Sequence, residues 1–302
     1  MDAILETGIA WVLWLQQYHP ALDEIMVALT LPGEALFYVV LFPALYWCVD
    51  RRLTLRLALL FMLSVYVNTW AKALVAQPRP FEYDPRVQMV RGATGGGLPS
   101  GHTQNTVVVW GYLAAWARRA WLLIVFVLLL VLVPLSRVYL GVHFPSDLLG
   151  GYLLGALLLW LALRYEEPAG ALARRLSLGW RLAAAMVAPP LVLLSMPHVH
   201  DRTMDGALLL SGAGVGFVLA QRYLPQSLHG PLWRLGLRLL LGLSTSLVLF
   251  GALEALSAAT GWTGLIHALL YAPLGLWMAL GVPWLFERAG LMNRRKGEAA
   301  GV

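Results

Sequence analysis

The chain of 302 residues is 59% hydrophobic and only 13% charged, and its mean hydropathy is +0.69. This balance excludes an ordinary soluble globular protein and a disordered chain, because so much apolar surface needs a bilayer to cover it. A net charge of +6 would also suit nucleic-acid binding, but in so apolar a chain we expect the basic residues to set orientation in a membrane. No nucleic-acid partner is therefore expected.

The apolar residues come in stretches long enough to cross a bilayer as helices. They predict an all-α fold, a polytopic transmembrane helical bundle of about nine spans. The expected spans are residues 33–49, 54–75, 99–117, 121–139, 146–164, 181–197, 204–223, 234–259 and 263–286. Residues 3–18 are predicted to form a helix lying at the membrane interface, with an extra span as the alternative. No Lys or Arg precedes Arg51, so no secretory signal is expected.

A polar, basic stretch separates two halves of the chain. The expected parts are an interfacial helix at 1–19, a catalytic core at 20–165, a cytoplasmic connection at 166–180, a four-helix membrane extension at 181–288 and a basic cytoplasmic tail at 289–302. Most of the 22 Lys and Arg residues fall on one face of the nine-span arrangement, which is therefore expected to be cytoplasmic. The single cysteine, Cys48, is expected to be a packing residue.

Three short blocks of polar residues fall on the opposite, non-cytoplasmic face. They are Lys72 with Arg79-Pro80, then Pro99-Ser100-Gly101-His102, and finally Arg137 with His143 and Asp147 in SRVYLGVHFPSD. In a helical bundle the blocks converge at adjacent helix ends. Gathering cations and histidines at one membrane surface is costly unless something anionic binds there. The blocks therefore predict an anion site.

The residue types in these blocks suit phosphoryl transfer. Arg79 and Arg137 can fork onto phosphate oxygens, and Lys72 adds a point charge. The Ser100 hydroxyl and the Gly101 amide, at the start of a helix, can donate to a further oxygen. No cluster of carboxylates is available to hold Mg²⁺, so we expect neither a metal nor another cofactor, and the cations must supply the electrostatic stabilisation.

The two histidines are the candidate reacting groups. With Pro145 at the first helical position, Asp147 can reach one nitrogen of His143 and leave the other to attack phosphorus. His102 would protonate the leaving oxygen and then activate water for the second step.

The three blocks together resemble the signature of the type 2 phosphatidic acid phosphatase (PAP2) superfamily: K-x6-R-P, P-S-G-H and S-R-x5-H-x3-D. The resemblance covers about residues 60–155. It implies a metal-independent phosphatase in which His143 becomes a phosphohistidine and His102 acts as acid and base. It also implies phosphate contacts from Lys72, Arg79, Ser100, Gly101, His102 and Arg137. The stretch 37–47, the outward N-terminus and the span count are similar to the glucose-6-phosphatase and sphingosine-1-phosphate phosphatase branch.

A lipid phosphomonoester is the expected substrate, because the blocks lie at helix ends at headgroup depth. A sugar phosphate and a polyprenyl diphosphate are the alternatives. Vanadate-dependent halide oxidation is disfavoured by the apolar composition, and a non-hydrolytic lipid transporter by the His143–Asp147 pair. We expect a multi-pass membrane protein, of the plasma or inner membrane if bacterial, with its active site on the non-cytoplasmic face.

Overall fold

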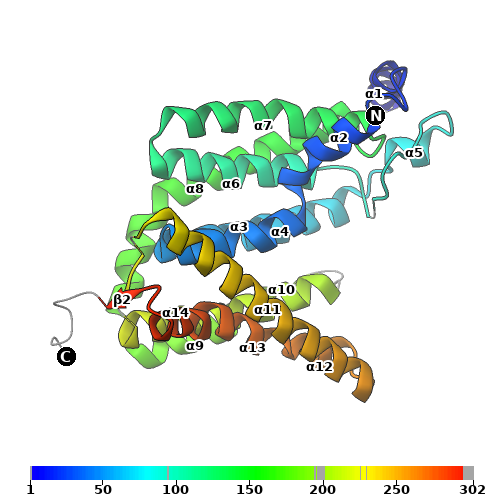
Figure 1. The fold of residues 1–302 in the computed structure, drawn as a ribbon. Helices are drawn as coiled ribbons and strands as arrows, with labels where there is room; N and C mark the ends of the chain where they lie inside the picture. Colours follow the sequence, from blue (N-terminus) through cyan, green and yellow to red (C-terminus); the bar gives the residue numbers. More distant parts are fainter. Residues whose placement is uncertain are drawn as a thin grey trace. The chain divides into compact units, whose positions relative to one another are not determined.

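The computed structural model describes residues 2–93, 95–193, 195, 201–224, 226–228 and 230–294. Within them the regular secondary structure is helical apart from two paired antiparallel strands of two residues each, so the predicted helical class is confirmed. The elements drawn in Figure 1 are α1 (Asp2–Gln16), α2 (Asp23–Thr30), η1 (Leu31–Gly33), α3 (Ala35–Cys48), α4 (Arg51–Val75), α5 (Pro80–Tyr83), α6 (Gly101–Ala117), α7 (Ala120–Tyr139), α8 (Pro145–Arg175), α9 (Leu178–Leu193), α10 (Asp201–Tyr223), β1 (Gln226–Ser227), α11 (Leu232–Thr260), α12 (Gly264–Leu269), α13 (Tyr271–Leu276), η2 (Trp277–Gly281), α14 (Val282–Arg288) and β2 (Asn293–Arg294). Of the predicted basic tail, residues 295–302 lie outside the described residues.

In the described part of the chain, six helical segments are long and apolar enough to cross a membrane. They are Arg51–Tyr83, Ala120–Tyr139, Pro145–Arg175, Thr203–Tyr223, Leu232–Thr260 and Gly264–Arg288. A seventh would arise if the pair Asp23–Gly33 and Leu36–Cys48, bent by 46°, made one span. Helices α6 and α9 have only 17 and 16 residues. The chain is a multi-pass membrane protein, and the predicted number of about nine spans is not confirmed.

The chain divides into two compact units. The first comprises Met1–Tyr38 and Leu60–Glu166, and the second comprises Val39–Leu59 and Glu167–Val302. These units differ from the predicted core and extension, because Val39–Leu59 falls in the second unit. Helix α8 continues to Arg175, so most of the stretch predicted as a connection is helical.

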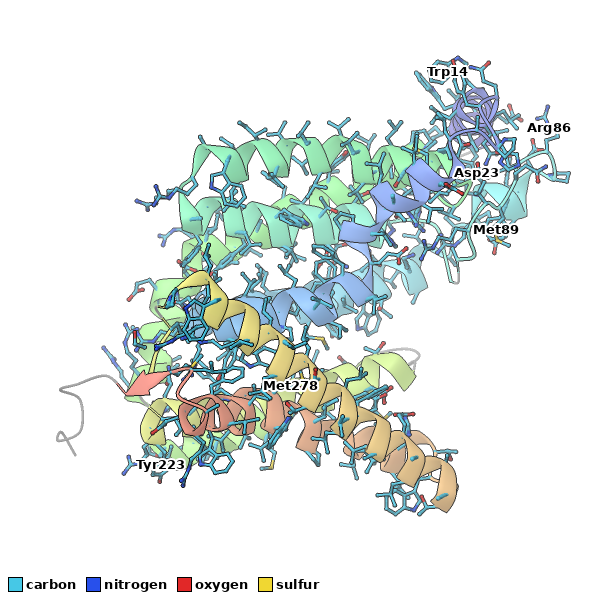
Figure 2. The ribbon with its side chains drawn as sticks, in the orientation of Figure 1. Trp14, Asp23, Arg86, Met89, Tyr223 and Met278 are labelled. Atoms are coloured by element: carbon cyan, nitrogen blue, oxygen red, sulfur yellow. The ribbon has the colours of Figure 1, made fainter. Side chains whose placement is uncertain are left out.

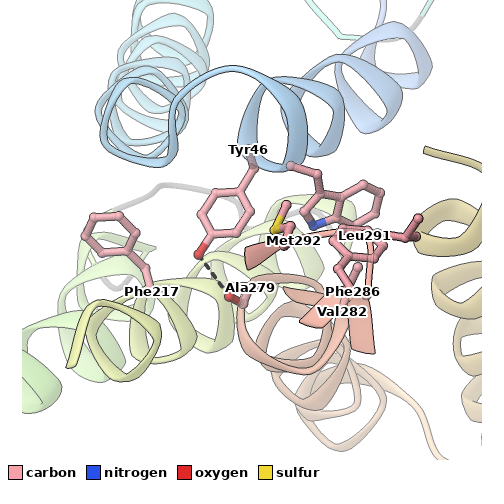
Figure 3. Packing of buried hydrophobic residues seen from close by; sticks show 8 residues of the cluster. Tyr46, Phe217, Ala279, Val282, Phe286, Leu291 and Met292 are labelled. Atoms are coloured by element: carbon pink, nitrogen blue, oxygen red, sulfur yellow. Dashed lines mark hydrogen bonds between the residues drawn. The ribbon is translucent and has the colours of Figure 1, made fainter. Parts of the chain in front are cut away.

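Aromatic packing explains why Val39–Leu59 belongs to the second unit. The Tyr46 hydroxyl donates to the Ala279 carbonyl oxygen at 2.9 Å, as Figure 3 shows, and the Trp47 indole N–H donates to the Met278 carbonyl oxygen at 2.9 Å. The fully buried Trp47 ring also meets Phe286 edge to face, with 5.8 Å between ring centres. Two hydrogen-bonded aromatic side chains thus fix this segment against the C-terminal helices.

Polar contacts near the β1–β2 pair complete the second unit. The guanidinium of Arg238 is fully buried and donates to the carbonyl oxygens of Leu228 at 2.6 Å and Leu291 at 2.8 Å. It thereby pairs with two carbonyl groups that lie outside the helices. Cys48 packs as expected, half-buried, with its Sγ 3.8 Å from the Leu235 carbonyl oxygen.

In the first unit, α1 crosses the end of the helices that carry the candidate site. Figure 1 views α1 almost along its axis, whereas α6 and α7 run across the view. Leu5, Ile9 and Val12 are buried and pack in one cluster with Phe144. The opposite side of α1 exposes aromatic residues such as Trp14, labelled in Figure 2. This amphipathic pattern suits a helix at the membrane interface, and that location stays a prediction.

Candidate active site

The predicted site residues lie at helix ends on one side of the first unit. Helices α4 and α7 end there and α6 and α8 begin there, on the side where Figure 1 shows α5. Helix α6 starts at Gly101 with Ser100 as its N-cap, and α8 starts at Pro145, as the sequence predicts. The last turns of α4 and α7 carry Lys72 and Arg137. The three blocks therefore lie together where these four helices end or begin.

His143 and Asp147 form a buried pair. Nδ1 of His143 lies 3.1 Å from Oδ2 of Asp147, and the side chains are 2% and 0% exposed. Because a carboxylate only accepts, the proton of the neutral imidazole resides on Nδ1 and Nε2 keeps its lone pair. Burial, followed by the charges of Arg137, Lys72 and Arg79, holds the pKa of His143 well below its usual value. The ring is therefore neutral near pH 7, with Nε2 able to act as a nucleophile.

The Asp147 carboxylate accepts from further donors. Its Oδ2 accepts from the Phe144 backbone N–H at 2.9 Å, and its Oδ1 accepts from Nε2 of Gln77 at 2.6 Å. The Ser100 backbone N–H donates to the Asp147 carbonyl oxygen at 2.9 Å, which ties the start of α6 to the start of α8. The sequence does not predict Gln77, because an isolated glutamine two positions before Arg79 carries no motif signal.

Arg79 lies beside the unprotonated nitrogen of His143. Its Nη1 is 3.5 Å from Nε2 of His143 and donates to the Val142 carbonyl oxygen at 2.7 Å. Its Nε donates to the Gly95 carbonyl oxygen at 2.8 Å, and its backbone N–H donates to Oε2 of Glu82 at 2.8 Å. These contacts hold a guanidinium next to the atom that is expected to attack phosphorus.

Lys72 and Arg137 donate to uncharged acceptors. Nζ of Lys72 lies 2.6 Å from the Gly96 carbonyl oxygen, and Nη1 of Arg137 lies 3.0 Å from Oγ1 of Thr30. Thr30, fully buried at the end of α2, is a second residue that the sequence does not predict. In the part of the chain that the structure describes, no group of three or more His, Cys, Asp or Glu side chains could hold a metal ion. The positive charges that act on His143 include those of Arg137, Lys72 and Arg79.

His102 occupies the first turn of α6. Its Nε2 is buried and has no hydrogen-bond partner among the described residues. A Cβ atom added to Gly33 would come within 2.9 Å of the His102 ring, so η1 packs directly against it. A buried imidazole nitrogen without a partner is suited to a substrate oxygen or a water molecule.

Ser100 caps α6 in a way that leaves its own proton available. Its Oγ accepts from the Thr103 backbone N–H at 3.4 Å and from Oγ1 of Thr103 at 3.1 Å. The Ser100 O–H can therefore still donate to an anion. Asn68 holds the same block from α4, because its Nδ2 donates to the Pro99 carbonyl oxygen at 3.2 Å and to Oε1 of Gln104 at 3.0 Å.

Two glycines allow α8 to approach α6 closely. A Cβ atom on Gly151 would lie 2.7 Å from the Ser100 carbonyl oxygen, and one on Gly155 would lie 2.8 Å from Cβ of Val107. Small residues four positions apart permit such contacts between membrane helices. This close contact fixes the start of α8 against the start of α6.

Substitution of Gly151 by alanine should lower both thermal stability and activity. The new methyl group meets backbone and must displace α8, which costs about 1–3 kcal/mol and outweighs the roughly 0.5–1 kcal/mol that alanine gains in a helix. The measurement is the melting temperature in detergent together with phosphate release. Gly236→Ala is the matched control, because nothing lies within 4 Å of a Cβ there. Equal melting temperatures for the two variants would contradict the steric argument.

Two family models match the chain. The PAP2 superfamily model covers residues 53–170, and the PAP2 superfamily phosphatase transmembrane extension covers residues 205–294; together they match more than half of the chain. The chain thus combines a multi-pass helical architecture with three polar blocks at one set of helix ends, and the family models place it in a class of membrane proteins. The chain belongs to the PAP2 superfamily. The C-terminal helices, to which the sequence assigns no motif, fall in the second matched range.

Individual relatives match to different extents. The chain is 30% identical to sphingosine-1-phosphate phosphatase 2 of Mus musculus over 61% of this chain and 54% of that protein. It is 26% identical to glucose-6-phosphatase 3 of Bos taurus over 94% of this chain and 96% of that protein. A transmembrane PAP2-type phosphatidylglycerolphosphate phosphatase from Bacillus subtilis is a structural match with 26% identity and a TM-score of 0.48, over 56% of this chain and 88% of that one. The chain spans about half the length of several curated relatives that it matches.

Proposed function

We propose that this protein is a metal-independent membrane phosphatase that hydrolyses a phosphomonoester, preferentially of a lipid, through a phosphohistidine at His143. The observation that carries the proposal is the buried pair in which Asp147 accepts from Nδ1 of His143 at 3.1 Å while Nε2 lies 3.5 Å from the Arg79 guanidinium. An oriented neutral imidazole beside a fixed cation suits nucleophilic attack on a phosphate group. Binding without hydrolysis would not need the oriented pair.

The reaction has two balanced steps. In the first, Nε2 of His143 bonds to phosphorus, the ester P–O bond breaks, and His102, which takes up its proton together with the phosphate dianion, gives that proton to the leaving oxygen. In the second, His102 takes a proton from water, the resulting hydroxide oxygen bonds to phosphorus, and the P–N bond breaks to regenerate His143 and release phosphate. Nδ1–H donates to Asp147 throughout and lets that carboxylate stabilise the charge on the ring.

Side chains supply the charge stabilisation in this proposal. Lys72, Arg79 and Arg137 face the phosphoryl oxygens, while the Ser100 hydroxyl and the Gly101 backbone N–H donate from the start of α6. Guanidinium and ammonium groups concentrate positive charge where the transition state gains negative charge, so the proposed reaction needs no metal ion.

We place the site at the non-cytoplasmic face, because the basic loops are expected on the cytoplasmic side. Helix ends at headgroup depth favour a lipid substrate that enters sideways from the bilayer. A sugar phosphate is the second candidate, favoured by the glucose-6-phosphatase 3 relative that matches nearly the whole chain. A polyprenyl diphosphate is a further alternative within the same chemistry.

The substrate class can be tested with purified protein in detergent and in vesicles. We expect kcat/KM for a long-chain lipid phosphomonoester to exceed that for a hexose phosphate by at least about tenfold, since the acyl chains add binding energy in the bilayer. The same assays with His143→Ala subtract contaminating phosphatase. A higher kcat/KM for the hexose phosphate would overturn the lipid preference and leave the phosphatase proposal intact.

A further inference from the structure

The two oxygens of the Asp147 carboxylate face different partners. Oδ2 accepts from His143 and from the Phe144 backbone, whereas Oδ1 accepts from the side-chain amide of Gln77 at 2.6 Å. Gln77 is 7% exposed and Asp147 is fully buried. Gln77 occupies one of the six unspecified positions between Lys72 and Arg79 in the first block, yet its amide is bonded to the group that orients the proposed nucleophile.

We infer that Gln77 is a positioning residue for the reaction proposed above: its amide fixes the rotation of the Asp147 carboxylate so that Oδ2 meets Nδ1 of His143. A carboxylate turns about a single bond, and a donor on Oδ1 selects one rotation. The amide donates without adding charge, so the carboxylate keeps its full charge for the ring cation that forms when Nε2 bonds to phosphorus. This inference rests on the proposed function.

The backbone around Gln77 is itself held in place. The Gln77 carbonyl oxygen accepts from the Gly97 backbone N–H at 2.8 Å. A Cβ atom on Gly97 would come within 3.0 Å of Oδ2 of Asp147, so this backbone also closes over the carboxylate. The backbone that carries the Gln77 amide is therefore held in place, as a positioning role requires.

In the hydrogen bonds described above, the Gln77 amide donates to the Asp147 carboxylate and has no bond to Lys72, Arg79 or Arg137. Its loss should therefore slow the chemical steps and leave phosphate binding almost unchanged. We expect Gln77→Met, which keeps the volume and removes the donor, to lower kcat by about tenfold to a hundredfold while KM stays within about threefold. Gln77→Glu places an acceptor 2.6 Å from an acceptor and should lower kcat further. The rate of phosphohistidine formation in a rapid-quench experiment should fall by the same factor as kcat.

Gln16→Met is the matched control. Gln16 is 9% exposed, and its amide donates to the backbone carbonyl oxygens of Gln88 at 2.7 Å and Tyr139 at 2.8 Å. It should lose stability as Gln77→Met does, with kcat per folded molecule close to that of the unmodified protein. The folded fraction of each variant, measured by size-exclusion chromatography in detergent, normalises kcat, so partial unfolding does not obscure the comparison.

The outcomes separate this inference from the proposed function. An unchanged kcat per folded molecule in Gln77→Met would overturn the positioning role, and so would a rise in KM with kcat unchanged. If His143→Ala is inactive and Gln77→Met is fully active, only this inference fails. If His143→Ala retains hydrolysis, the proposed function fails as well.

Discussion

Replacement of His143 by alanine is expected to lower phosphate release by about 10⁴-fold or more, because the variant has no group that can form the covalent intermediate. The Phe144 backbone and Gln77 still donate to Asp147 at 2.9 and 2.6 Å, so the carboxylate keeps partners and the fold should survive. The assay is release of inorganic phosphate from a lipid phosphomonoester, with a melting curve to verify folding. If turnover of the variant stays within tenfold of that of the unmodified protein, His143 is not the nucleophile.

The intermediate can be observed directly in His102→Ala. With a substrate whose leaving group needs no proton, such as an aryl phosphate, the first step should proceed and the second should stall, because no base activates water. Acid-labile, base-stable phosphate should then accumulate on His143 and be found by mass spectrometry. Phosphate trapped on another residue would contradict the assignment.

Replacement of Arg79 by lysine is expected to lower kcat/KM by about 10²- to 10³-fold. Lysine keeps the charge and loses the rigid fork, whose Nε and Nη1 donate to two carbonyl oxygens while Nη1 lies 3.5 Å from Nε2 of His143. A flexible ammonium cannot reproduce that geometry, so both phosphate orientation and charge stabilisation suffer. Steady-state kinetics on the same lipid phosphomonoester provide the measurement.

Arg86→Lys is the matched control for Arg79→Lys. Arg86 follows in the same loop, its side chain is 70% exposed, and it pairs with Asp84. An exposed ion pair of this kind contributes little, so the variant should keep nearly full activity. Equal losses in the two variants would show that the loop, rather than the guanidinium beside His143, is responsible.

The parts of the site that the sequence could predict are those encoded locally. Pro145 begins α8 and Ser100 caps α6, because proline suits the first position of a helix and serine suits its N-cap. From those starting points, the spacing of His143 and Asp147 fixes their contact at 3.1 Å. The roles assigned to the eight predicted site residues stay predictions.

The partners of those residues could not be predicted. Gln77 and Thr30 reach Asp147 and Arg137 only through tertiary packing, and neither amide nor hydroxyl side chains follow a periodic pattern. Hydropathy assigns most of Val39–Leu59 to parts of two predicted spans but does not say which helices it packs against, so its place in the second unit was not predicted. The number of spans depends on helix lengths, which hydropathy does not fix, and α6 has only 17 residues. Hydropathy also does not reveal that polar residues of α6, such as Gln104, are buried.

The hydrogen bonds of Lys72 and Arg79 to the carbonyl oxygens of Gly96 and Gly95 have a consequence for selectivity. An incoming anion can take the free Ser100 hydroxyl proton, but for these N–H groups of Lys72 and Arg79 it must compete with acceptors that the chain already provides. A tetrahedral dianion brings more oxygens and more charge to that competition than a carboxylate or a halide does. We therefore expect the resting site to discriminate against the abundant monovalent anions around it before any chemistry begins.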